Sequence, residues 1–227
     1  MITLMPATSM LVPDWSRIHT VFLDMDGTLL DLHFDNYFWQ VHVPLRFAER
    51  YGLTTEAARA QLLPRFRAME GSLQWYCLDH WARELDMDIL ALKREVQRLI
   101  QILPHVEKFL KKLRSSGKRM LLVTNAHSDA LTLKMQRTQL DSHFDAIVSS
   151  HSFGVPKETL SFWQSLREIE DFDPQHSLLL DDSLPVLRAA RDYGIGNLIA
   201  MRRPDSRQPS RDNAEFMSVE TLAELMP

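Results

Sequence analysis

Two carboxylates stand two residues apart, directly after an apolar stretch near the start of the chain. The segment VFLDMDGTLLD at residues 21–31 passes from that stretch into Asp24, Asp26, Gly27 and Thr28. Carboxylates this close repel each other, and Mg²⁺, which binds a few carboxylates together with water and phosphate oxygens, relieves the repulsion. Gly27 can adopt the backbone conformation that turns the chain sharply away from such a site. The spacing predicts a magnesium site, and a solvated Asp-Gly turn is the alternative when the segment is considered alone.

Polar side chains that bind metals or anions recur after three further apolar stretches. Asp181 and Asp182 follow the residues SLLL and add two more carboxylates. Thr124 and Asn125 follow MLLV, and they offer a hydroxyl, an amide and backbone N–H groups to phosphate oxygens. Lys157 opens a helical stretch after another apolar run. Each feature alone fits a helix cap or a surface lysine, but together they predict one site for a metal and a phosphate group.

The stretches that carry these residues have the length and composition of strands buried on both faces. Continuous apolar runs of this kind are typical of parallel sheets, and they cover residues 20–24, 120–124, 146–150, 177–181 and 195–201. Helical patterns separate the later runs, at residues 126–139, 158–169 and 184–193. This alternation predicts a Rossmann-like α/β fold with a doubly wound parallel sheet. In such folds ligands bind beyond the carboxyl ends of the strands, where the residues named above fall.

A long gap separates the first apolar run from the second. A helical pattern at residues 104–116 accounts for the end of this gap. The remainder, residues 32–103, carries apolar stripes at helical spacing and no strand pattern. We therefore predict an α/β core domain made of residues 1–31 and 104–227, with a helical domain of residues 32–103 inserted after the first strand.

Composition argues against several classes of protein. The 227 residues are 45% hydrophobic and 25% charged, as in ordinary soluble globular proteins. The formal net charge of −4 argues against a protein that binds nucleic acid or an anionic membrane. A single cysteine excludes an internal disulfide and fits a reducing compartment. Apolar stretches are shorter than a membrane span, and the first residues lack the pattern of a signal peptide, so we expect a cytoplasmic protein.

The motif residues resemble those of the haloacid dehalogenase-like superfamily of phosphotransferases. The likeness rests on DMDGT at 24–28, TN at 124–125, PK at 156–157 and DDS at 181–183. The helical insert falls where that superfamily places the cap domain in members whose cap follows the first motif. True dehalogenases lack an acid at the position of Asp26, so the resemblance implies phosphoryl transfer instead of dehalogenation.

A closer resemblance extends into the helical insert. The segments DNYFWQ (35–40), WYCLDHW (75–81), TNAH (124–127) and FGVPKE (153–158) look like those of the bacterial GMP/IMP 5′-nucleotidase family. This resemblance implies a Mg²⁺-dependent hydrolase of purine nucleoside 5′-monophosphates that forms an aspartyl-phosphate intermediate. A sugar-phosphate phosphatase or a sugar phosphomutase of the same superfamily is the alternative, because the core residues are shared. A mutase needs a second phosphate site, for which the insert offers Arg46, Arg50, Arg59, Arg65 and Arg67.

The resemblance also implies a role for each matched residue. Asp24 is the expected nucleophile, and Asp26 is expected to protonate the leaving oxygen and then to activate water. The metal is expected to bind Asp24, the backbone carbonyl of Asp26 and Asp182, with Asp181 acting through water. The residues expected to hold phosphate or substrate in the core are Thr28, Thr124, Asn125 and Lys157.

Recognition of the leaving group is expected in the helical insert, because the core residues bind only phosphate. Tyr37 and Trp39 follow the first motif closely, and we expect them to stack on a purine base. Trp75 and Trp81 fall on a helical stripe that predicts packing inside the insert. His127 either caps the following helix or contacts the substrate. The expected partner is thus a small phosphomonoester.

Overall fold

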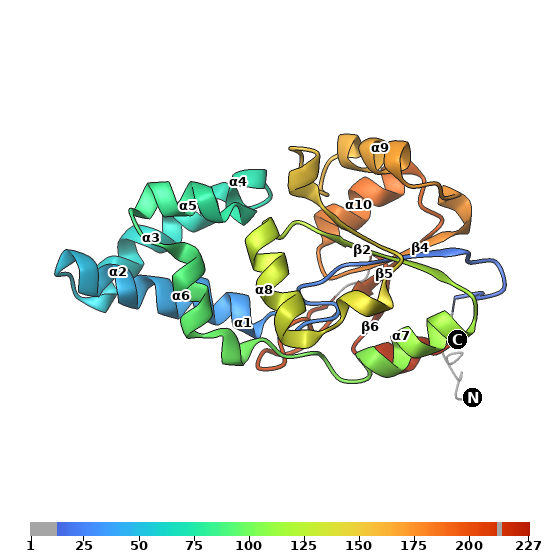
Figure 1. Ribbon diagram of the computed structural model, residues 1–227, viewed down its shortest axis with the longest axis horizontal. Coiled ribbons are helices and arrows are strands. Elements are labelled where there is room, and N and C mark those ends of the chain that lie inside the picture. Colours follow the sequence, from blue (N-terminus) through green and yellow to red (C-terminus); the bar gives the residue numbers. More distant parts are fainter. Residues whose placement is uncertain (1–12, 213–214) are drawn as a thin grey trace, which may run out of the picture.

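A six-stranded parallel sheet forms the centre of the computed structural model, which describes residues 13–212 and 215–227 (Figure 1). The strands lie in the order β3-β2-β1-β4-β5-β6, and every neighbouring pair is parallel. They are β1 (Thr20–Leu23), β2 (Arg119–Thr124), β3 (Ala146–Ser149), β4 (Ser177–Asp181), β5 (Asn197–Met201) and β6 (Met217–Val219). Residues 1–12, on which the expectation about a signal peptide mostly rests, lie outside the described residues.

Helices cover both faces of the sheet (Figure 1). Val21 and Leu23 of β1 pack in one apolar cluster with the helix that precedes β2, whereas Phe22 packs in a second cluster with the helices flanking β4. This period of two is the alternation of a strand that is buried on both faces. The covering helices are α7 (Val106–Ser115), α8 (Ser128–Thr138), α9 (Leu160–Ile169) and α10 (Leu184–Tyr193). The predicted α/β fold with a doubly wound parallel sheet is confirmed.

The residues between β1 and α7 form a second group of helices, which Figure 1 shows gathered at one end of the molecule beside the sheet. We call residues 32–103 the helical segment. Its interior is aromatic: the Phe66 ring lies 4.9 Å from that of Trp81 and 5.2 Å from that of Trp39, centroid to centroid. Its elements are α1 (His33–Tyr37), a π-helical turn (Phe38–His42), α2 (Val43–Tyr51), α3 (Thr55–Met69), α4 (Leu73–Tyr76), α5 (Leu78–Leu85) and α6 (Ile89–Glu95).

The structure also contains elements too short to be predicted from periodicity. β6 pairs with β5 through three residues, which carry no pattern that distinguishes a strand from a loop. Short 3₁₀ turns lie at Gln97–Leu99, Asp141–His143, Ser150–Ser152, Pro174–His176 and Leu222–Leu225. Within residues 13–212 and 215–227, none of the helices combines the length and the apolar composition needed to cross a membrane.

Candidate active site

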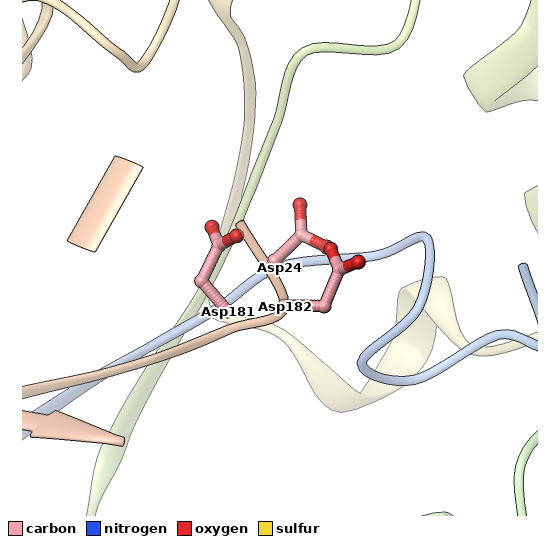
Figure 2. A group of neighbouring side chains, drawn as sticks. All are labelled: Asp24, Asp181 and Asp182. Atoms are coloured by element: carbon pink, nitrogen blue, oxygen red, sulfur yellow. The ribbon is translucent and has the colours of Figure 1, made fainter. Parts of the chain in front are cut away.

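The order of the strands brings three predicted motifs together at one edge of the sheet. β1 lies between β2 and β4, and Asp24, Thr124 and Asp181 stand at the carboxyl ends of these strands. The Asp24 backbone N–H donates to the carbonyl oxygen of Leu180 at 3.0 Å, which keeps Asp24 level with the end of β4. Figure 2 shows Asp24, Asp181 and Asp182 grouped at this edge with their carboxylates on the same side.

These three aspartates, which we call the acidic triad, have the donor set of a site for a divalent cation. One carboxylate oxygen from each lies within 4.8 Å of the others. Burial raises the pKa of Asp24 to about 7 against the opposing charge of Lys157. Burial also raises the pKa of Asp182 well above its usual range, and the charges of Asp181 and Asp24 add to this effect. Neighbouring carboxylate oxygens that repel one another fit Mg²⁺, which Asp24, Asp181 and Asp182 could hold.

Gly27 allows Asp182 to lie against the turn after β1. Its φ is +88°, a region that side chains other than glycine rarely adopt. A Cβ at this position would lie 2.8 Å from Cγ of Asp182 and 2.8 Å from Cβ of Pro204. Glycine is therefore required both by the backbone conformation and by the close approach of the acidic triad.

Lys157 supplies the positive charge of the site. Its Nζ lies 2.6 Å from Oδ1 of Asp24 and 2.8 Å from Oδ2 of Asp181, and it also donates to the carbonyl oxygen of Val123 at 3.0 Å. Burial alone would lower the pKa of this lysine, but the charges of Asp181 and Asp24 outweigh burial and raise it. Lys157 is thus a buried ammonium ion that faces the predicted nucleophile, where it can bind a phosphate oxygen.

Thr124 and Asn125 are buried beside Lys157 and have fixed orientations. The Thr124 hydroxyl accepts a hydrogen bond from the backbone N–H of Ala126 at 3.0 Å. Oδ1 of Asn125 accepts from the backbone N–H of Lys157 at 2.9 Å, and its Nδ2 donates to Oε2 of Glu158 at 2.9 Å. These bonds join the end of β2 to the segment that carries Lys157, so the predicted phosphate-binding residues do lie together.

Asp26 lies beside the acidic triad but has different surroundings. Its Oδ2 lies 2.7 Å from Nζ of Lys134, a residue of α8. Burial raises the pKa of Asp26 to about 6, although the charge of Lys134 opposes the shift. A carboxyl group that titrates near neutral pH can both donate and accept a proton, as a general acid and base must.

A cavity of about 850 Å³ lies between the sheet edge and the helical segment, and both Asp24 and Asp26 line it. Trp39 lines the cavity, as predicted, and packs against Phe66. Tyr37 does not line it; its ring packs 6.1 Å from that of His33 and 6.5 Å from that of His42. The structure therefore brings Trp39 to the cavity and leaves Tyr37 outside its wall.

Two further predicted residues are placed by the structure. Thr28 is fully buried, does not line the cavity, and within the described part of the chain its hydroxyl has no hydrogen-bond partner. His127 lines the cavity and also caps α8, where its Nδ1 accepts from the backbone N–H of Asp129 at 3.4 Å. The two roles considered for His127 are thus compatible with each other.

Several charged residues on the cavity wall were not identified from the sequence. Arg211 lies in the loop after β5, and its Nη1 lies 3.2 Å from Oδ2 of Asp182. No local motif marks such a residue, because its position depends on how the loop folds over the sheet edge. Asp35 begins one of the segments that carry the resemblance, but its own type and position do not predict a role at the cavity. The charged residues added by the structure are Asp35, Glu70, Lys93, Lys134, Glu158, Arg188, Arg202, Arg211 and Asp212.

Comparisons with known proteins agree with this geometry. A family model described as haloacid dehalogenase-like hydrolase matches residues 18–194. The GMP/IMP nucleotidase YrfG of Escherichia coli (strain K12) is 37% identical over 213 residues, which are 94% of this chain and 96% of that protein. The protein of the same name from Shigella flexneri has the same identity and coverage.

Solved structures show the same fold. A HAD phosphatase from Thermococcus onnurineus has a TM-score of 0.75 and 21% identity, and the match covers 92% of this chain and 96% of that one. An L-2-haloacid dehalogenase from Xanthobacter autotrophicus, with chloropropionic acid covalently bound, has a TM-score of 0.61 and 16% identity over 92% and 96% of the two chains. At such identities the solved structures support the fold alone.

The resemblance predicted from four short motifs is thus confirmed by independent comparisons. The family model spans the helical segment and β1 to β4, and the nucleotidases cover nearly the whole chain. The acidic triad and Lys157 stand where the motifs predicted them, at the carboxyl ends of the strands. The chain belongs to the haloacid dehalogenase-like hydrolase family.

Proposed function

We propose that this hydrolase is a Mg²⁺-dependent phosphatase that converts the purine nucleoside 5′-monophosphates GMP and IMP to nucleoside and phosphate. The observation that carries the phosphatase chemistry is the buried ion pair between Lys157 and Asp24, at the floor of a cavity that also holds Asp26. The likeness to nucleotidases that are named for GMP and IMP supports the substrate.

In the proposed reaction, a carboxylate oxygen of Asp24 attacks phosphorus and forms an aspartyl phosphate, while the bond from phosphorus to the ribose 5′-oxygen breaks. Asp26 gives its proton to that oxygen, and the nucleoside leaves as an alcohol. Asp26 then takes a proton from water, which attacks phosphorus; the bond from phosphorus to the Asp24 oxygen breaks, and inorganic phosphate and the free Asp24 carboxylate are released. Lys157, Thr124 and Asn125 hold the phosphoryl oxygens, on which negative charge accumulates. Mg²⁺ bound by the acidic triad supplies the positive charge that lets an anionic nucleophile approach a phosphate dianion.

The proposed Mg²⁺ fits the residues present, since two buried carboxylates and the partly buried carboxylate of Asp182 lie together beside Lys157. We propose that Asp24 and Asp182 bind the ion directly and that Asp181, whose Oδ2 is paired with Lys157 at 2.8 Å, acts through water. The backbone carbonyl of Asp26 completes the proposed protein ligands. In this division of roles Lys157 keeps its contacts with Asp24 and Asp181, and its ammonium group and the cation both lie beside the proposed phosphate position.

The wall of the cavity formed by α3 suits a 6-oxopurine. Arg59 and Arg67 line the cavity on one face of this helix, and neither forms an ion pair with another described residue. A guanidinium group donates two parallel hydrogen bonds to the O6 and N7 acceptors that guanine and hypoxanthine share. Adenine carries an amino group in place of O6, so the same arginines favour GMP and IMP over AMP. Trp39 and the half-buried Trp75 border this wall and offer aromatic surface for stacking.

The experiment that tests the proposal is a phosphate-release screen over nucleoside monophosphates and sugar phosphates. We expect kcat/KM for GMP and IMP to exceed the values for AMP and for glucose phosphates by at least about tenfold, or about 1.4 kcal/mol in transition-state binding. Arg59→Ala and Arg67→Ala should remove most of the preference over AMP. The matched control is Arg65→Ala, on the same helix, because Arg65 pairs with Glu84 at 2.8 Å and does not line the cavity. A sugar phosphate that is hydrolysed tenfold better than GMP would refute the proposed substrate.

A sugar phosphomutase is the alternative, because unpaired arginines on the cavity wall could also bind a second phosphate group. The two functions differ in whether water reaches the aspartyl phosphate. Release of inorganic phosphate from a monophosphate without an activating bisphosphate identifies a phosphatase. Strict dependence on a sugar bisphosphate, with no net release of phosphate, would identify a mutase.

A further inference from the structure

A chain of four charged groups, two buried lysines and two partly buried aspartates, runs from Asp26 into the helical segment. Nζ of Lys134 lies 2.7 Å from Oδ2 of Asp26 and 2.6 Å from Oδ2 of Asp35. The other carboxylate oxygen of Asp35, Oδ1, accepts from Nζ of Lys93 at 2.7 Å. Both lysines are 2% exposed. Negative and positive groups alternate along this charge chain (Asp26, Lys134, Asp35 and Lys93), so that each lysine is compensated where it is buried.

The charge chain connects elements that are far apart in the sequence. Asp26 lies in the turn after β1 and Lys134 lies on α8, which covers the sheet. Asp35 lies on α1 and Lys93 on α6, both in the helical segment. All four side chains line the cavity that holds the acidic triad. The orientation of Asp26 is thus tied both to the sheet and to the helices above it.

Lys134 is held firmly enough to orient its partner. Its buried ammonium group lies between two carboxylates, that of Asp26 at 2.7 Å and that of Asp35 at 2.6 Å. Asp35 in turn is held at both oxygens by the two lysines. Among the described residues, Lys134 is the partner that the structure gives to the Asp26 side chain. Its contact is with Oδ2, which leaves Oδ1 of Asp26 for the substrate.

A purely structural ion pair does not account well for this arrangement. Replacement of a buried ion pair by apolar residues of similar size is often neutral or stabilising, so stability alone does not require such a pair. The charge chain also ends on the side chain that the proposed mechanism uses to transfer a proton. A carboxyl group fixed at one oxygen presents the other in one direction, which proton transfer to a bound leaving group requires.

We propose that Lys134 is a positioning residue, which holds Oδ2 of Asp26 so that Oδ1 faces the leaving oxygen of the substrate, and that Asp35 fixes Lys134 in place. This inference rests on the proposed function, in which Asp26 donates the proton. During the transfer, the proton moves from Oδ1 to the leaving oxygen as the phosphorus–oxygen bond breaks. The Asp26 carboxylate that forms remains paired with the Lys134 ammonium group.

The test compares two leaving groups in the full-length Lys134→Met variant, in which a side chain of similar size carries no charge. The alkoxide of GMP needs a proton to leave, whereas the phenolate of p-nitrophenyl phosphate leaves without one. We expect single-turnover formation of guanosine to slow by about a hundredfold, the scale of a lost general acid. The burst of nitrophenolate should change less than about threefold, and Lys134→Arg should restore part of the rate with GMP.

The matched control is Lys93→Met, which removes the other buried lysine of the charge chain without touching Asp26. This variant should slow both substrates to a similar extent. Equal losses of rate with both substrates in Lys134→Met would show a merely structural role and overturn the inference. The inference would also be overturned if the rate with GMP fell as much more than the rate with p-nitrophenyl phosphate in Lys93→Met as in Lys134→Met. If Lys134→Met does not fold, as judged by thermal unfolding, Lys134→Gln with the same two substrates decides the question.

Failure of the proposed substrate is distinguishable from failure of this inference. Wild-type protein that ignores GMP but hydrolyses another alkyl phosphate refutes the nucleotidase proposal alone. The comparison with p-nitrophenyl phosphate is then made with that alkyl phosphate. A larger loss of rate with the alkyl phosphate than with p-nitrophenyl phosphate in Lys134→Met supports the role of Lys134. Equal losses of rate overturn that role, whichever alkyl phosphate is hydrolysed.

Discussion

The Tyr76 hydroxyl of α4 donates to Oε1 of Glu158 at 2.7 Å, and the other oxygen of the same carboxylate accepts from Nδ2 of Asn125 at 2.9 Å. Tyr76 belongs to the helical segment, whereas Glu158 follows Lys157 and Asn125 directly follows β2. The helical segment is therefore hydrogen-bonded, through one carboxylate, to a residue of the proposed phosphate site.

Tyr76→Phe removes this hydrogen bond and keeps the ring. A hydrogen bond to a charged group contributes about 1.5 kcal/mol or more, so kcat/KM for GMP should fall roughly tenfold. Steady-state kinetics measures the change. Tyr51→Phe is the control, because the Tyr51 hydroxyl donates to the carbonyl oxygen of Leu85, at 2.9 Å, within the helical segment. Equal effects of the two substitutions would contradict a role for the contact with Glu158.

The proposed roles of Asp24 and Asp26 can be separated by whether a variant of each residue accumulates the phosphoenzyme. Asp24→Asn removes the attacking carboxylate, so no phosphoenzyme should form with any substrate. Asp26→Asn keeps the nucleophile but removes the proton carrier, so an aryl phosphate should still phosphorylate Asp24. Hydrolysis of that intermediate should stall, and intact-protein mass spectrometry after acid quenching should show one added phosphate. The same adduct on Asp24→Asn, or normal turnover of GMP by Asp26→Asn, would overturn the assignment.

Asp182→Asn tests the acidic triad as a metal site. The substitution removes one anionic donor and keeps the size of the side chain, so the fold should persist while Mg²⁺ binds more weakly. Activity should fall at least tenfold and recover partly as the Mg²⁺ concentration is raised. Exhaustive chelation should abolish the activity of wild-type protein, and full activity after chelation would remove Mg²⁺ from the proposed mechanism.

Gly27→Ala tests whether the turn after β1 sets the geometry of the acidic triad. The new methyl group would meet Asp182 and Pro204 at 2.8 Å, at a backbone φ of +88°. We expect a loss of activity of at least tenfold together with a loss of stability of about 1–2 kcal/mol from the left-handed backbone. Gly52→Ala is the control, because Gly52 has a φ of +64° and no atoms within 4 Å of the added carbon. This control should lose stability and keep its activity.

Asp35→Asn makes a prediction about pH. Burial alone would raise the pKa of Asp35, but the charges of Lys134 and Lys93 outweigh burial and lower it. The folded state therefore favours ionised Asp35, and its contribution to the free energy of unfolding is complete above the unfolded pKa of about 4. That contribution is lost as the pH falls below this value, because the unfolded chain then binds the proton more readily.

Urea unfolding of wild-type and Asp35→Asn protein at pH 7 and pH 3 measures this contribution. The variant should be less stable by about 3 kcal/mol at pH 7, the scale for a broken buried ion pair, and the difference should shrink at pH 3. Asp86→Asn is the control, because the Asp86 carboxylate forms an exposed pair with Arg50. This control should change the stability little at either pH, and a difference for Asp35→Asn that grows at pH 3 would contradict the prediction.

The strand ends could be predicted because their signal is local. An apolar run that stops at Asp24, Thr124 or Asp181 shows both the strand and the residue at its end, and parallel pairing brings such ends together. Lys134 could not be predicted in this way, because a lysine on a helix usually faces solvent. Only the packing of α1 and α6 against α8 buries it between two carboxylates.

The helical segment shows a second limit of local patterns. The short distance from the first motif predicts both Tyr37 and Trp39 as cavity residues, yet of the two only Trp39 lines the cavity. A π-helical turn at Phe38–His42 interrupts the helix at this point. The wider turn breaks the 3.6-residue period from which the facing side of a helix is predicted. The sequence carries no mark of such a turn.

The position of β1 in the middle of the sheet determines when the site can assemble during synthesis. Thr20 of this first strand pairs with Arg119 on one side and with Ser177 on the other. The N-terminal part of a chain emerges first from the ribosome, so Asp24 meets Asp181 only after most of the chain has been made. Pairing across such separations is slow, because loop closure costs entropy. The intervening helices make local contacts, so the part of the protein proposed to select the substrate can fold before the part that performs the chemistry exists.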